Sequence, residues 1–217
     1  MDELLLTFND KQYKKYLDIK ENEAFELDFD TSLEQVTPSS PDTIKAESTK
    51  MVRECEKLLA IKNRQNVFVS AFSRKEIENL IPIFYTAIGK IDQSKRKLYQ
   101  ESILIAKNLE KADRICNNVY NRYSDFLPYK AALADKEEYR NNVIAVDEKF
   151  KESIALAEGQ RNHEKELLAG LSNIVDVIIP DFFKGISRAA DTPRFEHFND
   201  KEFFNSVSSF LEQIKNA

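Results

Sequence analysis

The chain has 217 residues, 42% of them hydrophobic and 32% charged, with a net charge of −5 at pH 7. Its four glycines and six prolines give little material for the tight turns of a β-sandwich, and no glycine-rich phosphate loop is present. A composition rich in Lys, Glu and Leu favours long solvated helices, so we predict an all-α protein.

Neither export by a signal peptide nor a transmembrane helix is expected. The N-terminus lacks the basic start and the sustained apolar core of a signal peptide. The most apolar stretch, residues 167–179, contains Asn173 and Asp176 and falls short of the roughly 20 residues that span a bilayer. Two cysteines, Cys55 and Cys116, do not make a disulfide framework, so we predict free thiols in a cytoplasmic protein.

Charge is unevenly distributed along the chain. Residues 44–130 carry 17 Lys or Arg against 10 Asp or Glu, whereas residues 1–43 carry 4 against 11 and residues 131–217 carry 11 against 16. Our main interpretation is that acidic and basic segments pack against each other, within one chain or in a homodimer. The alternative is a basic surface for an anionic partner.

Residues 1–42 are predicted to form an acidic arm and linker. Phe25, Leu27 and Phe29 alternate with carboxylates, which indicates a strand or an extended segment. This segment either pairs with the apolar residues 67–69 or binds along a groove, in its own chain or in a partner.

A helical bundle is predicted over residues 43–217, after a linker rich in proline and serine. Its first helix runs to about residue 62. Ser73 and Glu76 form a capping box that opens the next helix, in which Pro82 predicts a kink or a short break.

One long helix is marked by a seam of apolar or small residues in alternating steps of four and three: Leu98, Ser102, Ile105, Leu109, Ala112, Cys116, Val119, Tyr123 and Phe126. This helix is predicted to end before Pro128, which starts the return arm of a long antiparallel, coiled-coil-like hairpin over about residues 83–179. The fold class is therefore an elongated all-α bundle. Its seam is covered either within the chain or across a homodimer.

The return arm contains the polar stretch 160–165, which we interpret as a solvent-exposed waist or a hinge. The apolar stripe that follows is predicted to stop at Pro180. A C-terminal helical cap covers about residues 181–216, and Asn199 with Glu202 is predicted to cap its last helix.

No residue pattern supports catalysis, a metal or a cofactor. His163-Glu164 lacks the second histidine of the HExxH zinc motif, and the polar loop around His197 is typical of connections between helices. We therefore predict a protein that is not an enzyme.

Two groups of residues are candidates for partner binding. The first group is aromatic and apolar and is predicted to contact a protein: Phe25, Leu27, Phe29, Phe182, Phe183, Phe195, Phe198 and Phe204. In each Phe-Phe pair, adjacent rings point about 100° apart on a helix, so one ring is expected outside the core. The second group is basic and suits an anionic surface: Lys90, Lys95, Arg96 and Lys97.

The predicted function is non-enzymatic protein–protein interaction, in scaffolding, assembly or inhibition of a partner. The alternative is a protein that binds an anionic membrane peripherally through the basic helix face and the apolar residues 167–183, or that inserts residues 167–183 into the membrane on a trigger. Nucleic acid is disfavoured, because aromatic residues for base stacking are sparse near the basic cluster and nearby carboxylates dilute its charge.

Overall fold

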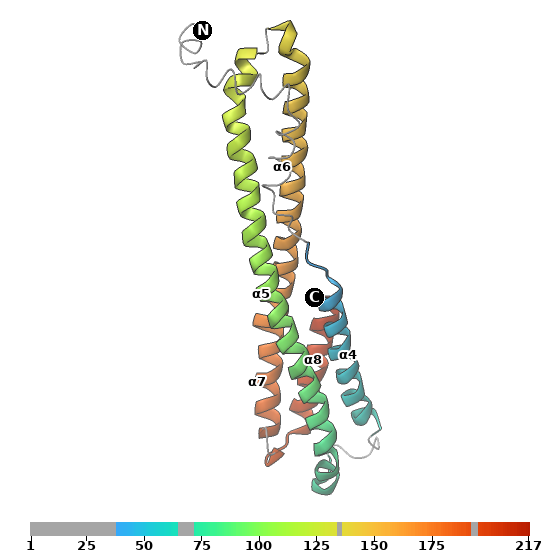
Figure 1. Cartoon of the computed structure of the whole chain (residues 1–217). Coiled ribbons are helices and arrows are strands. Elements are labelled where there is room, and N and C mark those ends of the chain that lie inside the picture. Colours follow the sequence, from blue (N-terminus) through green and yellow to red (C-terminus); the bar gives the residue numbers. More distant parts are fainter. Residues whose placement is uncertain (1–37, 65–71, 134–135, 192–194) are drawn as a thin grey trace. The chain divides into compact units, whose positions relative to one another are not determined.

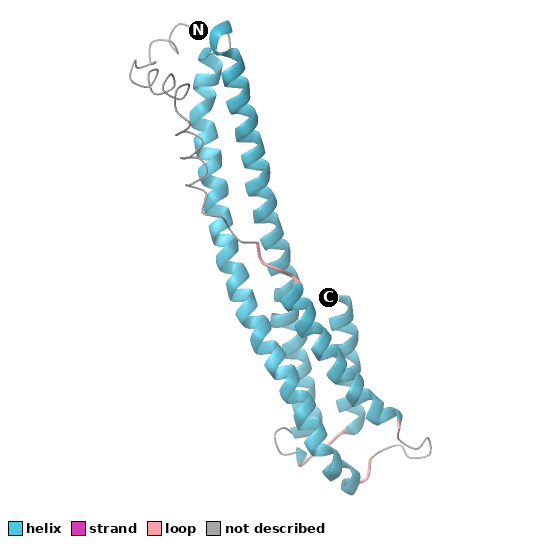
Figure 2. Cartoon of the chain, turned by 45° about the vertical axis from the view of Figure 1, so that its right-hand side comes forward, coloured by secondary structure: helices cyan, strands magenta, loops and turns pink. Residues whose placement is uncertain are grey.

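A computed structural model describes residues 38–64, 72–133, 136–191 and 195–217 (Figure 1). All regular structure in these ranges is helical (Figure 2), which confirms the all-α prediction. Residues 1–37, with the predicted arm, and residues 67–69 lie outside the described residues, so the predictions made there stay predictions.

The helices follow one another along the chain as α4 (Asp42–Asn63), α5 (Arg74–Leu133), α6 (Glu137–Ser172), the π-helix η1 (Asn173–Ile178), α7 (Ile179–Ala190) and α8 (Asp200–Asn216). The long helix α5 and the returning α6 form the predicted hairpin. Among the described helices, α4 and α8 begin and end close to the residues that the sequence pattern predicts.

The described residues divide into two compact units. In the described part of the chain, unit 1 consists of Pro38 and of residues 108–133 and 136–163 from α5 and α6. Unit 2 consists of residues 39–107 and 164–217, and therefore contains α4, the start of α5, the end of α6, and all of η1, α7 and α8.

The core of unit 2 is centred on aromatic side chains. Phe84 of α5 is fully buried, and its ring centroid lies 4.8 Å from that of Phe203 and 5.8 Å from that of Phe195. Helix α8 packs against both α4 and α7. A Cβ atom at Gly185 of α7 would lie 2.5 Å from Ser206 Oγ, so the close approach of α7 to α8 depends on this glycine.

The core of unit 1 is the interface between α5 and α6. Ala112, Cys116 and Val119 cluster with Ala157, while farther along α5 Phe126 packs on Phe150 with ring centroids 5.3 Å apart. All nine residues of the predicted seam are buried or half-buried, in unit 1 or in unit 2. The seam is therefore covered within one chain, and no homodimer is needed to bury it.

Both predicted N-terminal caps are confirmed. The Ser73 amide donates to Glu76 Oε2 at 2.7 Å, and the Glu76 amide donates back to Ser73 Oγ at 3.3 Å. At α8, the Glu202 amide donates to Asn199 Oδ1 at 3.1 Å. These short motifs were readable because each satisfies amides that a helix start leaves without partners.

The short break predicted at Pro82 as the alternative to a kink is wrong, and so is the helix end predicted before Pro128. Helix α5 continues through both Pro82 and Pro128 to Leu133, so the return arm begins at Glu137. Buried side chains flank each proline, with Phe84 close to the first, and Phe126 and Leu133 on either side of the second. Their burial outweighs a helix-interior proline, which costs about 3 kcal/mol.

The polar stretch 160–165 does not interrupt α6. Glu164, in the middle of it, is fully buried, so a wholly exposed waist is also wrong. The stripe does not stop at Pro180 either, since the chain passes through η1 into α7 with this proline in its first turn. A proline is tolerated there because first-turn amides need no helical acceptor.

Candidate functional site

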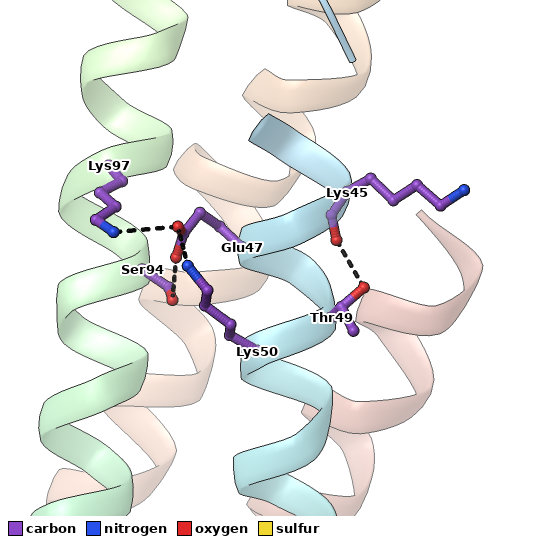
Figure 3. Close-up of polar contacts among 6 residues, drawn as sticks. All are labelled: Lys45, Glu47, Thr49, Lys50, Ser94 and Lys97. Carbon is purple, nitrogen blue, oxygen red and sulfur yellow. Dashed lines mark hydrogen bonds and ion pairs between the residues drawn. The ribbon is translucent and has the colours of Figure 1, made fainter. Parts of the chain in front are cut away.

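The basic cluster of α5 meets buried carboxylates of α4. Glu47 is 5% exposed, and its carboxylate accepts hydrogen bonds from Ser94 Oγ at 2.7 Å, Lys97 Nζ at 3.2 Å and Lys50 Nζ at 2.6 Å (Figure 3). Burial by itself would raise the pKa of Glu47, but the bonds from Lys50, Ser94 and Lys97 outweigh it and lower the pKa. The buried carboxylate is therefore ionised at neutral pH.

The arrangement repeats one heptad along α4. Glu54, 8% exposed, accepts from Lys57 Nζ at 2.6 Å and from Lys90 Nζ at 3.5 Å. The step from Glu47 to Glu54 is seven residues forward in α4, and the step from Lys97 to Lys90 is seven residues back in α5. Two ion pairs therefore fix one antiparallel register between these helices.

The other two cations of the cluster also have partners inside unit 2. Arg96 Nη2 lies 2.8 Å from Asp92 Oδ2, and Lys95 Nζ lies 5.0 Å from the ring centroid of Phe183. The carboxylates that pair with the cluster belong to the basic stretch 44–130 itself. The predicted packing of acidic segments against basic ones therefore does not account for these pairs.

The C-terminal phenylalanines lie mostly in the core. Phe182, Phe195 and Phe204 are at most 5% exposed, whereas Phe183 and Phe198 are half-buried. The expected exposure of one ring in each pair is wrong for Phe203-Phe204, because Phe72 packs on Phe204 at 5.8 Å and covers that side of α8. The three buried rings do not form a contact surface in this structure, and a partner-binding role for the group stays a prediction.

The apolar stretch 167–183 is also part of the core of unit 2. Its buried members are Leu171, Ile174, Val175, Ile178, Ile179 and Phe182, and Val177 is its one large side chain classed as exposed. Among the described helices, none is both long enough and apolar enough to cross a membrane.

Unit 1 also contains a buried carboxylate, Asp147, that the sequence pattern did not predict. Asp147 of α6 accepts from Tyr123 Oη at 3.0 Å, Lys130 Nζ at 2.8 Å and Lys151 Nζ at 2.7 Å. The bonds from Lys130 and Lys151 lower its pKa to about 2. One signal was available, because the next four-residue step of the seam after Phe126 falls on Lys130.

Three exposed apolar side chains of α5 in unit 2 make up what we call the α5 patch: Tyr99 and Ile103 lie one turn apart on one face, and Leu104 lies about 100° further around the helix. Tyr99, Ile103 and Leu104 are 55%, 43% and 50% exposed, although they lie within six residues of one helix. Exposed cations lie one turn before and after the patch, at Arg96 and Lys107. The 4-3 spacing of the seam does not reveal the α5 patch, because the residues of the patch point away from the seam.

Reactive groups are not gathered into a chemical centre in the described part of the chain. No cluster of three His, Cys, Asp or Glu side chains there could hold a metal ion. Burial raises the pKa of the Cys55 thiol to about 12, so it is not a thiolate at neutral pH. An open groove of about 600 Å³ between α7 and α8 is lined by polar and charged side chains, among them Lys184, Arg188 and Glu202.

Comparison with known proteins adds no assignment, since no family model, curated protein or solved structure matches the chain.

Proposed function

We propose that this chain is a non-enzymatic interaction protein that binds a partner protein through the α5 patch. The observation that carries the proposal is the exposure of Tyr99 and Ile103 on one face of α5, with exposed Leu104 at the edge of that face, on a helix whose seam is buried. Grouped apolar side chains on a polar surface are typical of protein contacts. The flanking Lys107 favours a partner whose apolar face carries a carboxylate at its rim, whereas Arg96 already pairs with Asp92.

The membrane alternative is less well supported by the contacts. Lys90 and Lys97 are engaged with buried Glu54 and Glu47, which reduces the charge that they present to lipid. Insertion of residues 167–183 would require the core of unit 2 to open, since most of their side chains are buried in it. A protein partner requires neither change. A cytoplasmic location and a role in scaffolding, assembly or inhibition remain parts of this proposal.

Site-specific photo-cross-linking tests the proposal. A photoreactive amino acid is placed at position 103 of the full chain in the source cells, and the control carries it at Arg53, an exposed residue of α4 in the same unit. We expect a discrete protein adduct from position 103, none from position 53, and loss of the adduct when Tyr99→Glu is added. The Tyr99 side chain is 55% exposed, so this substitution should leave the fold intact.

Two further measurements identify the partner class. Sedimentation of the purified chain, with and without Ile103→Glu, detects self-association through the patch. Flotation with anionic and neutral vesicles at low and moderate salt tests lipid. Equal adducts at positions 103 and 53 would refute the α5 patch as the contact. Salt-sensitive flotation that Ile103→Glu abolishes would replace the protein partner with a membrane.

A further inference from the structure

One broad side of unit 1 carries exposed apolar residues that lie outside the seam. Tyr120 and Leu127 of α5 are 40% and 43% exposed, and Ile144 of α6 is 48% exposed. The Tyr120 hydroxyl donates to Glu158 of α6 at 2.5 Å, which fixes the level of one helix against the other. One heptad along the hairpin, Leu127 is therefore level with Lys151, and Ile144 follows one heptad beyond Lys151 on the same side. We call this side of the hairpin the Leu127 face.

The other residues of the Leu127 face are small or carry opposite charges. Steps of four and three residues add Ser124 and Ala131 on α5, and Ala155 on α6. The same steps place Glu148 one turn from Lys151, and both side chains are exposed. Two helices cover only the seam between them and leave a broad side open, whereas two hairpins stacked on such a side form a four-helix bundle.

We infer that the Leu127 face binds the same face of a second copy of the chain, with the two α6 helices antiparallel about a two-fold axis. The charges set the register. If Glu148 lies opposite the second copy's Lys151, the axis crosses α6 midway between these two residues. Ile144 and Ala155 are centred on the same point, so Ile144 then lies opposite the second copy's Ala155. One axis therefore pairs opposite charges and packs a large side chain on a small one, each twice by symmetry.

The same axis also matches the α5 helices. Leu127 is level with Lys151, so in the dimer it meets the second copy's α5 at the level of Glu148. Glu148 lies three residues before Lys151 in α6, and the corresponding point of α5 lies three residues after Leu127, beside Ala131. A large side chain again packs on a small one. Because the axis was chosen from α6 alone, the match on α5 supports it independently.

The charge pair is compatible with the contacts within each chain. Lys151 Nζ lies 2.7 Å from Asp147 Oδ2, but the side chain is 61% exposed and its ammonium has three donors, so it can also donate to the second copy's Glu148. An exposed pair of this kind contributes little to affinity and mainly sets orientation. Three apolar side chains in each copy make a small interface, so we expect a weak and reversible dimer.

Sedimentation equilibrium of the full chain over a range of concentrations tests the inference. Leu127→Glu should raise the dimer Kd at least about tenfold, because it places a carboxylate in the apolar part of the interface. The matched control is Leu156→Glu, which makes the same substitution in unit 1 at a 62% exposed position off the Leu127 face and should leave the Kd unchanged. Ile103→Glu, in the α5 patch of unit 2, should also leave it unchanged. Circular dichroism verifies that each variant keeps its helix content.

Disulfide trapping tests the register. Ile144→Cys/Ala155→Cys should form a disulfide-linked dimer under mild oxidation, visible on a non-reducing gel. Within one chain the two positions are eleven residues apart on α6, a rise of about 16 Å, which is too far for a disulfide. The native Cys55 and Cys116 are buried and are not expected to react. Ile144→Cys/Leu156→Cys is the control and should not cross-link, because position 156 lies off the Leu127 face.

Three results would overturn the inference. A chain that stays monomeric up to millimolar concentration would refute self-association, and equal effects of Leu127→Glu and Leu156→Glu would refute this face as its site. Self-association that Ile103→Glu abolishes and Leu127→Glu does not would belong to the α5 patch. Efficient cross-linking of the single variant Ile144→Cys would refute the antiparallel register. The Leu127 face lies in unit 1 and the α5 patch in unit 2, so each proposal can fail without the other.

Discussion

Neutralising Asp147 should reduce the stability of unit 1 by an amount that depends on pH. The substitution Asp147→Asn keeps the shape of the side chain and removes the charge that Lys130 and Lys151 neutralise. The pKa of Asp147 falls from 3.8 to about 2, and each pKa unit corresponds to about 1.4 kcal/mol. The shift therefore allows about 2 kcal/mol at most. Because the two lysine side chains are 38% and 61% exposed, solvent screening reduces the expected loss to about 1 kcal/mol.

The sign of the pH dependence follows from the lowered pKa. A carboxyl whose pKa is lower in the folded state stabilises the fold above its unfolded pKa and loses that contribution as pH falls through the folded value. The difference between wild type and Asp147→Asn should thus be constant from pH 8 to pH 6. By pH 3 about half of it should be lost, because the unfolded chain then binds the proton more readily.

Urea unfolding followed by circular dichroism at 222 nm measures this difference at each pH, and hydrogen exchange at α6 locates it in unit 1. Glu148→Gln is the control, since it removes an adjacent but exposed carboxylate and should change the free energy of unfolding by less than about 0.5 kcal/mol. A difference that persists unchanged from pH 7 to pH 3 would refute the ion-pair explanation. An equal loss in Glu148→Gln would attribute the effect to net charge.

Three further substitutions test packing and helix stability. Gly185→Ala should destabilise unit 2 by about 1 kcal/mol, because the new Cβ meets Ser206 Oγ at 2.5 Å, and Ser206→Ala should recover part of the loss. Gly159→Ala, which has no atom within 4 Å of its new Cβ, should instead stabilise α6 by about 0.5 to 1 kcal/mol in the same urea titration. Pro128→Ala should raise the melting temperature of unit 1, because the proline is exposed inside α5 and denies the helix one hydrogen bond. A lower melting temperature would show that the proline ring contributes packing that outweighs this bond.

Periodicity and capping were predictable because both depend on neighbours in sequence. The seam requires only that a helix repeat every 3.6 residues, and the caps at Ser73 and Asn199 require only a side chain within reach of the next turn. The partners of the seam could not be predicted in the same way. Ile105 belongs to the core of unit 2, whereas Ala112, one heptad later, packs in unit 1. No pattern in the sequence near these residues predicts the change from the core of unit 2 to that of unit 1.

The predictions made at the prolines were wrong, and the buried carboxylates were not predicted, for opposite reasons. The helix end before Pro128 was predicted from the local effect of proline on a helix, whereas the burial of Phe126 and Leu133 in the tertiary structure keeps the helix continuous. Glu47 and Asp147 look like residues of a solvated helix face until the lysines that surround them are known. Each carboxylate accepts a hydrogen bond from one hydroxyl and pairs with two lysines, one across the interface and one from its own helix. That set is assembled only when two helices meet.

These polar clusters supply what an apolar seam lacks, which is a unique register. If α4 moved by seven residues along α5, Glu54 would meet Lys97 and one ion pair would survive. Glu47 would then lie opposite Leu104 and would keep Lys50 of its own helix but lose Ser94 and Lys97, and Lys90 would lie opposite Ile61 and lose Glu54. Each hydrogen bond lost by the buried Glu47 carboxylate costs about 1.5 to 3 kcal/mol, whereas apolar contacts at heptad spacing change little under the same shift. The α4–α5 register is thus determined by its least apolar residues. The exposed position of the α5 patch depends on that register, because the shift would bring α4 alongside Leu104.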